Sequence, residues 1–253
     1  MKAQFKYAFL SGLYVRGAAF AVILIMDVIF ITLGSLGMLP LAAHITAVSL
    51  GGAAVAVMLA ANIGGDVMIS RRMFSAPEAY LYALTPVPRA RMLFASVIAM
   101  AAMDIFTMAF VITAEVILSF NLVGGEIWQT VRNFLNENPS YLSYGLSYIL
   151  TLISGYFLMM MIILFSVTMK HSLLYKMKAS GFLSLLTAFG CIYIASLSQL
   201  LLTPFSDIQR QGLMIIVSPG NTAGIIMLTL LILLEAAGLF FLTSKLMERK
   251  INL

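Results

Sequence analysis

The sequence predicts an all-α membrane protein with six transmembrane helices and with both termini in the cytoplasm. Hydrophobic residues make up 62% of the 253-residue chain, charged residues make up only 10%, and the mean hydropathy is +1.03. A soluble domain usually carries about 25% charged residues, so lipid rather than water must solvate much of this chain. Two further observations support the fold class. Apolar runs of bilayer length follow one another along the chain, and basic residues gather on alternate connections.

The apolar runs have about the 20 residues that a helix needs to cross the hydrocarbon. They are continuously apolar rather than alternating, which predicts helices and not the strands of a barrel. Only a short turn around Pro40 separates the first two runs, so we expect them to form an antiparallel hairpin. Together they make one transmembrane domain over residues 1–253. The predicted spans are residues 17–39, 44–69, 92–122, 142–169, 181–203 and 223–244.

The distribution of Lys and Arg predicts the orientation, because short cytoplasmic segments carry an excess of basic residues. With a cytoplasmic amino terminus, 13 of the 15 basic residues, Arg16 among them, fall on the inner side, and only Arg132 and Arg210 fall outside. The net charge of +5 favours attraction to an anionic leaflet. No basic helix or aromatic platform supports binding to nucleic acid. We therefore expect a multi-pass protein of the cell membrane that does not bind nucleic acid.

Two segments outside the spans have the pattern of amphipathic helices. In residues 1–16, Phe5, Phe9 and Leu13 recur at helical spacing among basic residues, which predicts an interfacial elbow helix along the cytoplasmic leaflet. An unstructured basic leader is the alternative. A short helix is also expected in the outer segment 121–141. The first apolar run is too long for the h-region of a signal peptide, so we expect it to remain as an anchor.

The cytoplasmic loop 70–91 carries the most specific local signals. Ser75, followed three residues later by Glu78, forms a capping box, and the helix ends before Pro86 because the residue before a proline avoids helical dihedrals. A capped helix of about two turns is more than a simple connection needs, which favours a docking surface. A plain interfacial helix anchored by its tyrosines is the alternative. The residues expected to form the docking surface are Arg71, Arg72, Ser75, Glu78, Tyr80, Tyr82, Arg89 and Arg91.

The end of this loop carries a family resemblance. Leu84-Thr85-Pro86-Val87-Pro88-Arg89, which leads directly into the third span, resembles the Leu-x-Pro-Val-Ser-Arg signature of type-two ABC exporter permeases. Pro88 departs from the family, which more often has serine or threonine there. The short basic tail 245–253 is similar to theirs as well. The resemblance implies two permease subunits and two ATPase subunits, with the loop helix and the elbow transmitting ATP-driven closure to the spans.

The expected partners and cofactors follow from this resemblance and from the chain itself. The sequence has no GxxxxGK[ST] phosphate loop, so we expect a transport subunit that is not an enzyme and binds no cofactor. ATP and Mg would be bound by a cytoplasmic ABC ATPase subunit. Six helices are a small number to enclose a pathway, which favours a second permease subunit. We expect a homodimer rather than a heterodimer. Membrane lipid is the other expected partner.

Carboxylates within the predicted spans are the candidate lining of a substrate pathway. Asp27, Asp104, Glu115 and Glu235 lie inside spans that contain no Lys or Arg. Each costs about 2.5–3.5 kcal/mol at the bilayer centre, so each should face the bundle or water. Asp104 and Glu115 are 11 residues apart and therefore share one face of the third span. The alternative is structural hydrogen bonding to a neighbouring helix. Asp66, close to the arginines of the loop, is expected to be a solvated interface charge.

Intramembrane proteases do not fit the residue types. Ile63-Gly64-Gly65-Asp66 lacks the first glycine of a Gly-x-Gly-Asp aspartyl-protease turn, and both histidines, His44 and His171, fall at span ends. No grouping typical of metal ligands is visible.

The function predicted from the sequence is that of a permease subunit of an ATP-driven exporter. Spans with four carboxylates and no basic side chain should favour cationic cargo, because a low dielectric magnifies the preference for one sign of charge. The expected cargo is an amphiphilic, cationic peptide or drug-like molecule leaving the cytoplasm or the inner leaflet. Two other classes stay open, namely an ion-coupled secondary transporter or channel, and a membrane scaffold or sensor that transports nothing.

Overall fold

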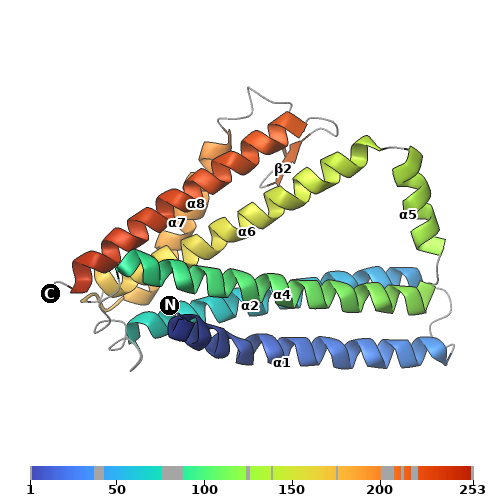
Figure 1. Cartoon of the computed structure of the whole chain (residues 1–253), viewed down its shortest axis with the longest axis horizontal. Helices are drawn as coiled ribbons and strands as arrows, with labels where there is room; N and C mark the ends of the chain where they lie inside the picture. The colour runs from blue at the N-terminus through green and yellow to red at the C-terminus, as the bar shows by residue number, and fades with distance from the viewer. Residues whose placement is uncertain are drawn as a thin grey trace. The chain divides into compact units, whose positions relative to one another are not determined.

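The structure is a computed structural model, and its described part is almost entirely helical (Figure 1). It describes residues 2–36, 43–75, 88–123, 126–137, 139–174, 176–200, 208–211, 214–217 and 222–251. The helices are α1 (Lys2–Ser35), α2 (Ala43–Ser75), α4 (Arg89–Val123), α5 (Glu126–Glu137), α6 (Ser140–Ser172), α7 (Ser180–Leu200) and α8 (Thr222–Ile251). A short antiparallel hairpin pairs β1 (Ile208–Gln211) with β2 (Met214–Val217).

Within the described ranges, six helices are long and apolar enough to cross a membrane. This confirms the prediction of a helical, multi-pass membrane protein. The six segments are Gly12–Leu33, Ser49–Phe74, Arg89–Phe120, Ser143–Ser172, Ser180–Leu200 and Thr222–Glu248.

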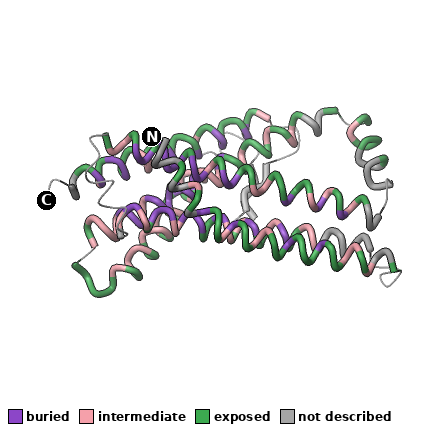
Figure 2. The backbone as a smooth tube through the Cα atoms, turned by 60° about the horizontal axis from the view of Figure 1, so that its bottom comes forward, coloured by how far each residue is buried: buried purple, intermediate pink, exposed green. Residues whose placement is uncertain are grey.

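Large apolar side chains remain exposed along these helices, and exposed positions recur along each of them (Figure 2). Phe106 on α4, Leu146 on α6, Phe189 on α7 and Leu234 on α8 are all exposed. On a soluble protein, an apolar surface of this extent would drive association or aggregation. In a bilayer the hydrocarbon covers it at no cost, and the helices satisfy their own backbone hydrogen bonds.

The helices differ from the predicted elements mainly at their ends. α1 is one continuous helix from Lys2, so the structure does not separate residues 1–16 as an elbow. No proline interrupts this stretch, and helix propagation adds a hydrogen bond for each further residue. α2 likewise continues past residue 69 to Ser75. The short helix expected within residues 121–141 is confirmed as α5. The β1–β2 hairpin was not predicted.

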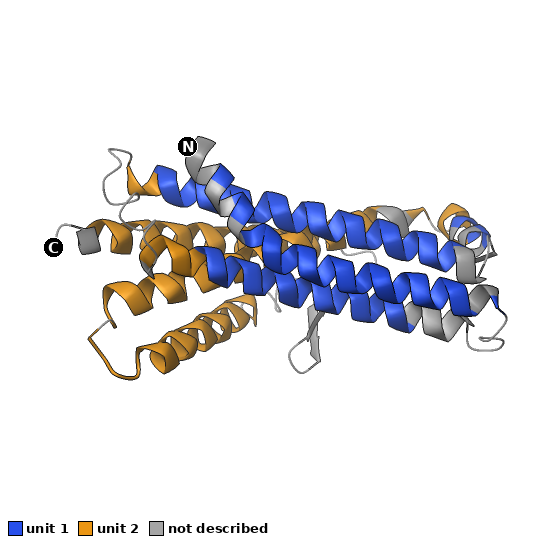
Figure 3. Ribbon diagram, turned by 90° about the horizontal axis from the view of Figure 1, so that it is seen from below, with its two compact units in different colours: residues 1–69, 91–133 blue, residues 70–90, 134–253 orange. Residues whose placement is uncertain are grey.

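The chain divides into two compact units (Figure 3). Unit 1 contains residues 1–69 and 91–133, and unit 2 contains residues 70–90 and 134–253. In unit 1, α1, α2 and α4 lie side by side (Figures 1 and 3). Their apolar core contains buried residues from all three helices, namely Ile23, Ala54, Met58 and Val111.

Unit 2 is built around α6, which packs against both α7 and α8. Two hydroxyl contacts tie these helices together. The hydroxyl oxygens of Thr151 on α6 and Thr229 on α8 are 2.7 Å apart, and Ser184 on α7 donates to the backbone carbonyl of Ser166 on α6 at 2.9 Å. Such interhelical hydrogen bonds are a common means of helix association within a membrane.

Candidate functional site

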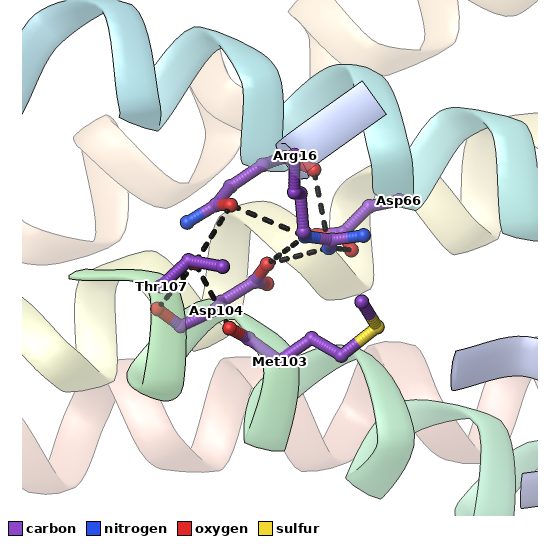
Figure 4. Close-up of polar contacts among 6 residues, drawn as sticks. Arg16, Asp66, Met103, Asp104 and Thr107 are labelled. Atoms are coloured by element: carbon purple, nitrogen blue, oxygen red, sulfur yellow. Dashed lines mark hydrogen bonds and ion pairs between the residues drawn. The ribbon is translucent and has the colours of Figure 1, made fainter. Parts of the chain in front are cut away.

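A buried arginine on α1 binds two carboxylates, one on α2 and one on α4, in unit 1 (Figure 4). Arg16 on α1 has 0% of its side chain exposed, against 1% for Asp66 on α2 and 2% for Asp104 on α4. The Arg16 Nη2 donates to Asp66 Oδ1 at 2.6 Å and to Asp104 Oδ1 at 2.5 Å. Its Nε donates to Asp104 Oδ1 at 2.9 Å and to Asn62 Oδ1 at 3.1 Å. We call these four residues the Arg16 cluster.

Helical spacing brings the members of the Arg16 cluster together. Asn62 and Asp66 are four residues apart and therefore lie on one face of α2, one turn from each other. On α4, the hydroxyl of Thr107 lies 3.1 Å from Asn62 Oδ1, one turn after Asp104. One side chain from α1 thus reaches polar groups of both neighbouring helices. Because charge-assisted hydrogen bonds are about twice as strong as neutral ones, the cluster holds the three helices in a defined register.

Two glycines leave room for the guanidinium group. A Cβ atom at Gly65 on α2 would lie 2.8 Å from Arg16 Cζ, which is closer than van der Waals contact permits. At Gly12 on α1, a Cβ atom would meet the Arg16 guanidinium and would lie 2.9 Å from Ile69 Cδ1. Both positions therefore admit the arginine because they carry no side chain. By contrast, a Cβ atom at Gly64 or at Gly17 would meet no heavy atom within 4 Å.

Two expectations from the sequence were wrong at this cluster. The spans were expected to hold no basic side chain, but Arg16 is fully buried within the apolar segment Gly12–Leu33. Asp66 was expected to be a solvated interface charge, but it is buried and paired. The reason is the same in both cases. α1 and α2 extend beyond the predicted spans, so residues placed at the interface lie inside the bundle, where each charge finds an opposite one.

Asp27 and Glu115 are the second group of buried carboxylates in unit 1. Only 6% of Asp27 on α1 and 8% of Glu115 on α4 are exposed. Both oxygens of Glu115 and the Oδ2 of Asp27 have no hydrogen-bond partner among the residues that the structure describes. The two carboxylates face the same part of unit 1, because Ile23, one turn before Asp27, and Val111, one turn before Glu115, are buried in one cluster. A Cβ atom at Gly51 on α2 would lie 3.4 Å from Glu115 Oε2, so α2 approaches Glu115 closely.

The remaining pathway candidate, Glu235 on α8, belongs to unit 2 and is partly buried. Its Oε1 accepts a hydrogen bond from the hydroxyl of Ser198 on α7. This is the geometry of the structural alternative, in which a carboxyl group is bound to a serine on a neighbouring helix. The pathway candidates of unit 1 therefore do not form one cluster. Asp104 binds Arg16, Asp27 and Glu115 lie together, and Glu235 is bound in unit 2.

The predicted docking surface is described only in part. Arg71 and Arg72 belong to α2, and Ser75 is its last residue. Arg89 and Arg91 lie in the first turn of α4. The predicted capped helix, with Glu78, Tyr80 and Tyr82, lies outside the described residues.

Sequence reasoning missed Arg16, Asn62, Gly12 and Gly65 as parts of a site. A signal for the arginine was present in its spacing. Arg16 precedes Asp27 by 11 residues, and Asp104 precedes Glu115 by the same 11 residues. When two parallel helices each carry two polar residues at the same spacing, the residues can meet in two pairs. Here Arg16 meets Asp104, and Asp27 meets Glu115.

Among the described residues, no group of three or more His, Cys, Asp and Glu side chains could hold a metal ion. Comparison of the chain with protein-family models, with curated proteins and with solved structures gave no match. The function of this membrane protein is therefore inferred from its own residues.

Proposed function

We propose that this chain is the membrane-spanning permease subunit of an ATP-driven exporter of the ABC class, located in the cell membrane. The observation that carries the proposal is the segment Leu84–Arg89, which has the order of the exporter signature. It is followed directly by a membrane-spanning helix, because α4 begins at Arg89. The layout of six apolar helices is compatible with such a subunit. Two permease chains, preferably identical, would work with two cytoplasmic ATPase subunits that bind ATP and Mg.

The coupling segment is the loop between α2 and α4. Arginines stand at both of its ends, with Arg71 and Arg72 in α2 and with Arg89 and Arg91 in α4. Basic side chains at these ends suit an acidic or phosphate-rich partner surface. Each of the two helices also carries a carboxylate that binds Arg16. A displacement of the loop by the ATPase would therefore act on helices that Arg16 ties to α1.

The proposed cargo is an amphiphilic, cationic peptide or drug-like molecule. The buried charged side chains described in unit 1 are four carboxylates and one arginine. Arg16 offsets part of the negative charge, but an excess of carboxylates remains. In a low dielectric this excess favours positive cargo over negative cargo. The four carboxylates are Asp27, Asp66, Asp104 and Glu115.

We expect changes in the loop to uncouple the permease from its ATPase. Replacing Tyr80 and Tyr82 with alanine, or Glu78 with lysine, should leave insertion unchanged but reduce co-purification of a co-expressed ABC ATPase subunit several-fold. The reason is that a docking helix recognises its partner through a few aromatic and charged side chains. The measurement is co-purification, together with ATP hydrolysis stimulated by a cationic amphipathic peptide in proteoliposomes.

The matched control is Tyr193→Ala, which removes an exposed tyrosine from α7 and should behave as wild type. Wild-type co-purification and stimulation in the loop variants would contradict the docking role and leave an interfacial helix. Peptide flux that survives ATP depletion but stops when the ion gradient collapses would replace the exporter with an ion-coupled transporter. Absence of any flux would favour a scaffold or sensor.

A second expected result concerns orientation. With Cys191 replaced by alanine, a cysteine introduced at Asn136 or Gln209 should react with a membrane-impermeant thiol reagent in intact cells. A cysteine at Ala76 should react only after the membrane is opened. This follows from the distribution of basic residues. Labelling of position 76 from outside would reverse the proposed orientation and remove the loop from the reach of a cytoplasmic ATPase.

A further inference from the structure

Asp27 and Glu115 form a polar layer of unit 1 that is separate from the Arg16 cluster. Asp27 lies 11 residues after Arg16 on α1, and Glu115 lies 11 residues after Asp104 on α4. This spacing corresponds to about 16 Å along each helix. Gly51 on α2 completes the layer, because a Cβ atom at this position would lie 3.4 Å from Glu115 Oε2. The three helices of unit 1 therefore meet at two polar levels.

The apolar core of unit 1 fills the space between these two levels. Ile23 lies one turn before Asp27, and Val111 lies one turn before Glu115. Both are buried in one cluster with Ala54 and Met58 of α2. The guanidinium of Arg16 is bound by Asp66 and Asp104 on the far side of this cluster, so it does not pair with the carboxylates of the second level.

No other described side chain of unit 1 supplies a positive charge to the pair. The remaining basic residues of unit 1 whose side chains are described, Lys6, Arg91 and Arg132, are exposed. Asp27 and Glu115 are themselves more than nine-tenths buried, and three of their four carboxyl oxygens have no hydrogen-bond partner among the described residues. An ionised carboxylate in such surroundings is very costly. A second one beside it adds repulsion that the low dielectric strengthens.

The chemistry of the pair identifies the ligand that can neutralise it. In the described part of the chain, no third His, Cys, Asp or Glu joins the pair to make a site for a metal ion. A proton needs only a carboxyl oxygen to hold it. We infer that Asp27 and Glu115 form a proton-binding site inside the membrane, which takes at least one proton from water and keeps it at neutral pH. Such a pair gains and loses protons as a unit rather than as two independent groups.

Proton binding by this pair requires no ATPase partner. A protonated pair would let α1 and α4 remain packed in the hydrocarbon, and release of the proton would place like charges between them. Both residues belong to this chain, so the test of the proton-binding site gives the same result whether or not the chain works with an ATPase.

The test uses a hydrophobic carbodiimide, which reacts with protonated carboxyl groups. The full-length chain in lipid nanodiscs is treated at neutral pH, and the modified peptides are identified by mass spectrometry. We expect Asp27 or Glu115 to be modified at least about tenfold more than Asp104. A difference of one unit in pKa changes the ratio of protonated to ionised carboxyl groups tenfold. Asp104 is an internal control, because it lies on the same face of α4 as Glu115 and is also buried but is bound to Arg16.

Two outcomes of this labelling would overturn the inference. Equal modification of Asp104 and the pair, or no modification of the pair, would show that the pair holds no proton of its own. Labelling that falls several-fold when Na⁺ replaces choline at constant ionic strength would show that the site binds a metal cation instead.

Infrared spectroscopy gives a second, independent readout. The carbonyl stretching band of protonated carboxylic acid should be present in the wild type at neutral pH and weaker in the Asp27→Asn/Glu115→Gln variant. The exposed Glu137→Gln variant is the control and should keep the wild-type band. An unchanged band in a correctly folded double variant would also contradict the inference.

Discussion

Replacing Arg16 with methionine is expected to lower the free energy of unfolding by about 3–5 kcal/mol, because it leaves two buried carboxylates without their opposite charge. Asp66 and Asp104 are almost fully buried, and both are bound by the Arg16 Nη2. Methionine keeps an unbranched apolar chain, so the loss reports on the charge more than on a cavity. The measurement is the thermal unfolding midpoint of the purified chain in detergent.

Two control variants separate the loss of the ion pairs from a general effect of the substitution. Arg91, on α4, also belongs to unit 1 but is exposed, so Arg91→Met should change stability by less than about 0.5 kcal/mol. A triple variant with Arg16→Met, Asp66→Asn and Asp104→Asn should recover most of the loss, because buried ion pairs can often be replaced by neutral groups. If Arg16→Met has the unfolding midpoint of the wild type, or if the triple variant is no more stable than the single variant, the cluster does not hold the helices.

The spanning helices could be predicted because hydropathy is a local property. A run of about 20 apolar residues has to be covered by lipid or by other helices, whichever neighbours it acquires. The shared face of Asp104 and Glu115 could be predicted for a similar reason, since helical geometry alone sets it. Both residues are buried on α4, and each one approaches a polar residue of α1.

The partner of each buried charge could not be predicted in this way. Arg16 stands near the start of an apolar run, where basic residues commonly extend to the interface. Its burial depends on the register of α1 against α2 and α4, which is a tertiary property. The roles of Gly12 and Gly65 depend on the same register. The effect of a missing side chain can be judged only when the atoms that lie against the glycine are known.

The ends of the helices were the other part that the sequence did not predict. α2 continues to Ser75 through two arginines. Hydropathy places the end of a span where charges begin, but the helix itself needs a capping signal or a proline to stop. The end of the apolar run and the end of the helix are therefore different positions, and the composition of the chain determines only the first.

Gly65 and its neighbour Gly64 offer the sharpest test of how closely α1 and α2 approach. Gly65→Ala should destabilise the chain by roughly 1–2 kcal/mol, whereas Gly64→Ala should be neutral or stabilising by up to about 1 kcal/mol. The measurement is again the thermal unfolding midpoint in detergent.

The opposite signs follow from what each new methyl group meets. Alanine in place of a helix glycine gains about 0.5–1 kcal/mol, and at Gly64 nothing within 4 Å opposes this gain. At Gly65 the methyl group would lie 2.8 Å from Arg16 Cζ. A flexible arginine could ordinarily move aside at little cost, but this guanidinium is bound by Asp66 and Asp104. Moving it lengthens those ion pairs, and overpacking of this kind costs about 1–3 kcal/mol. Equal effects of the two alanines would mean that the guanidinium does not lie against Gly65.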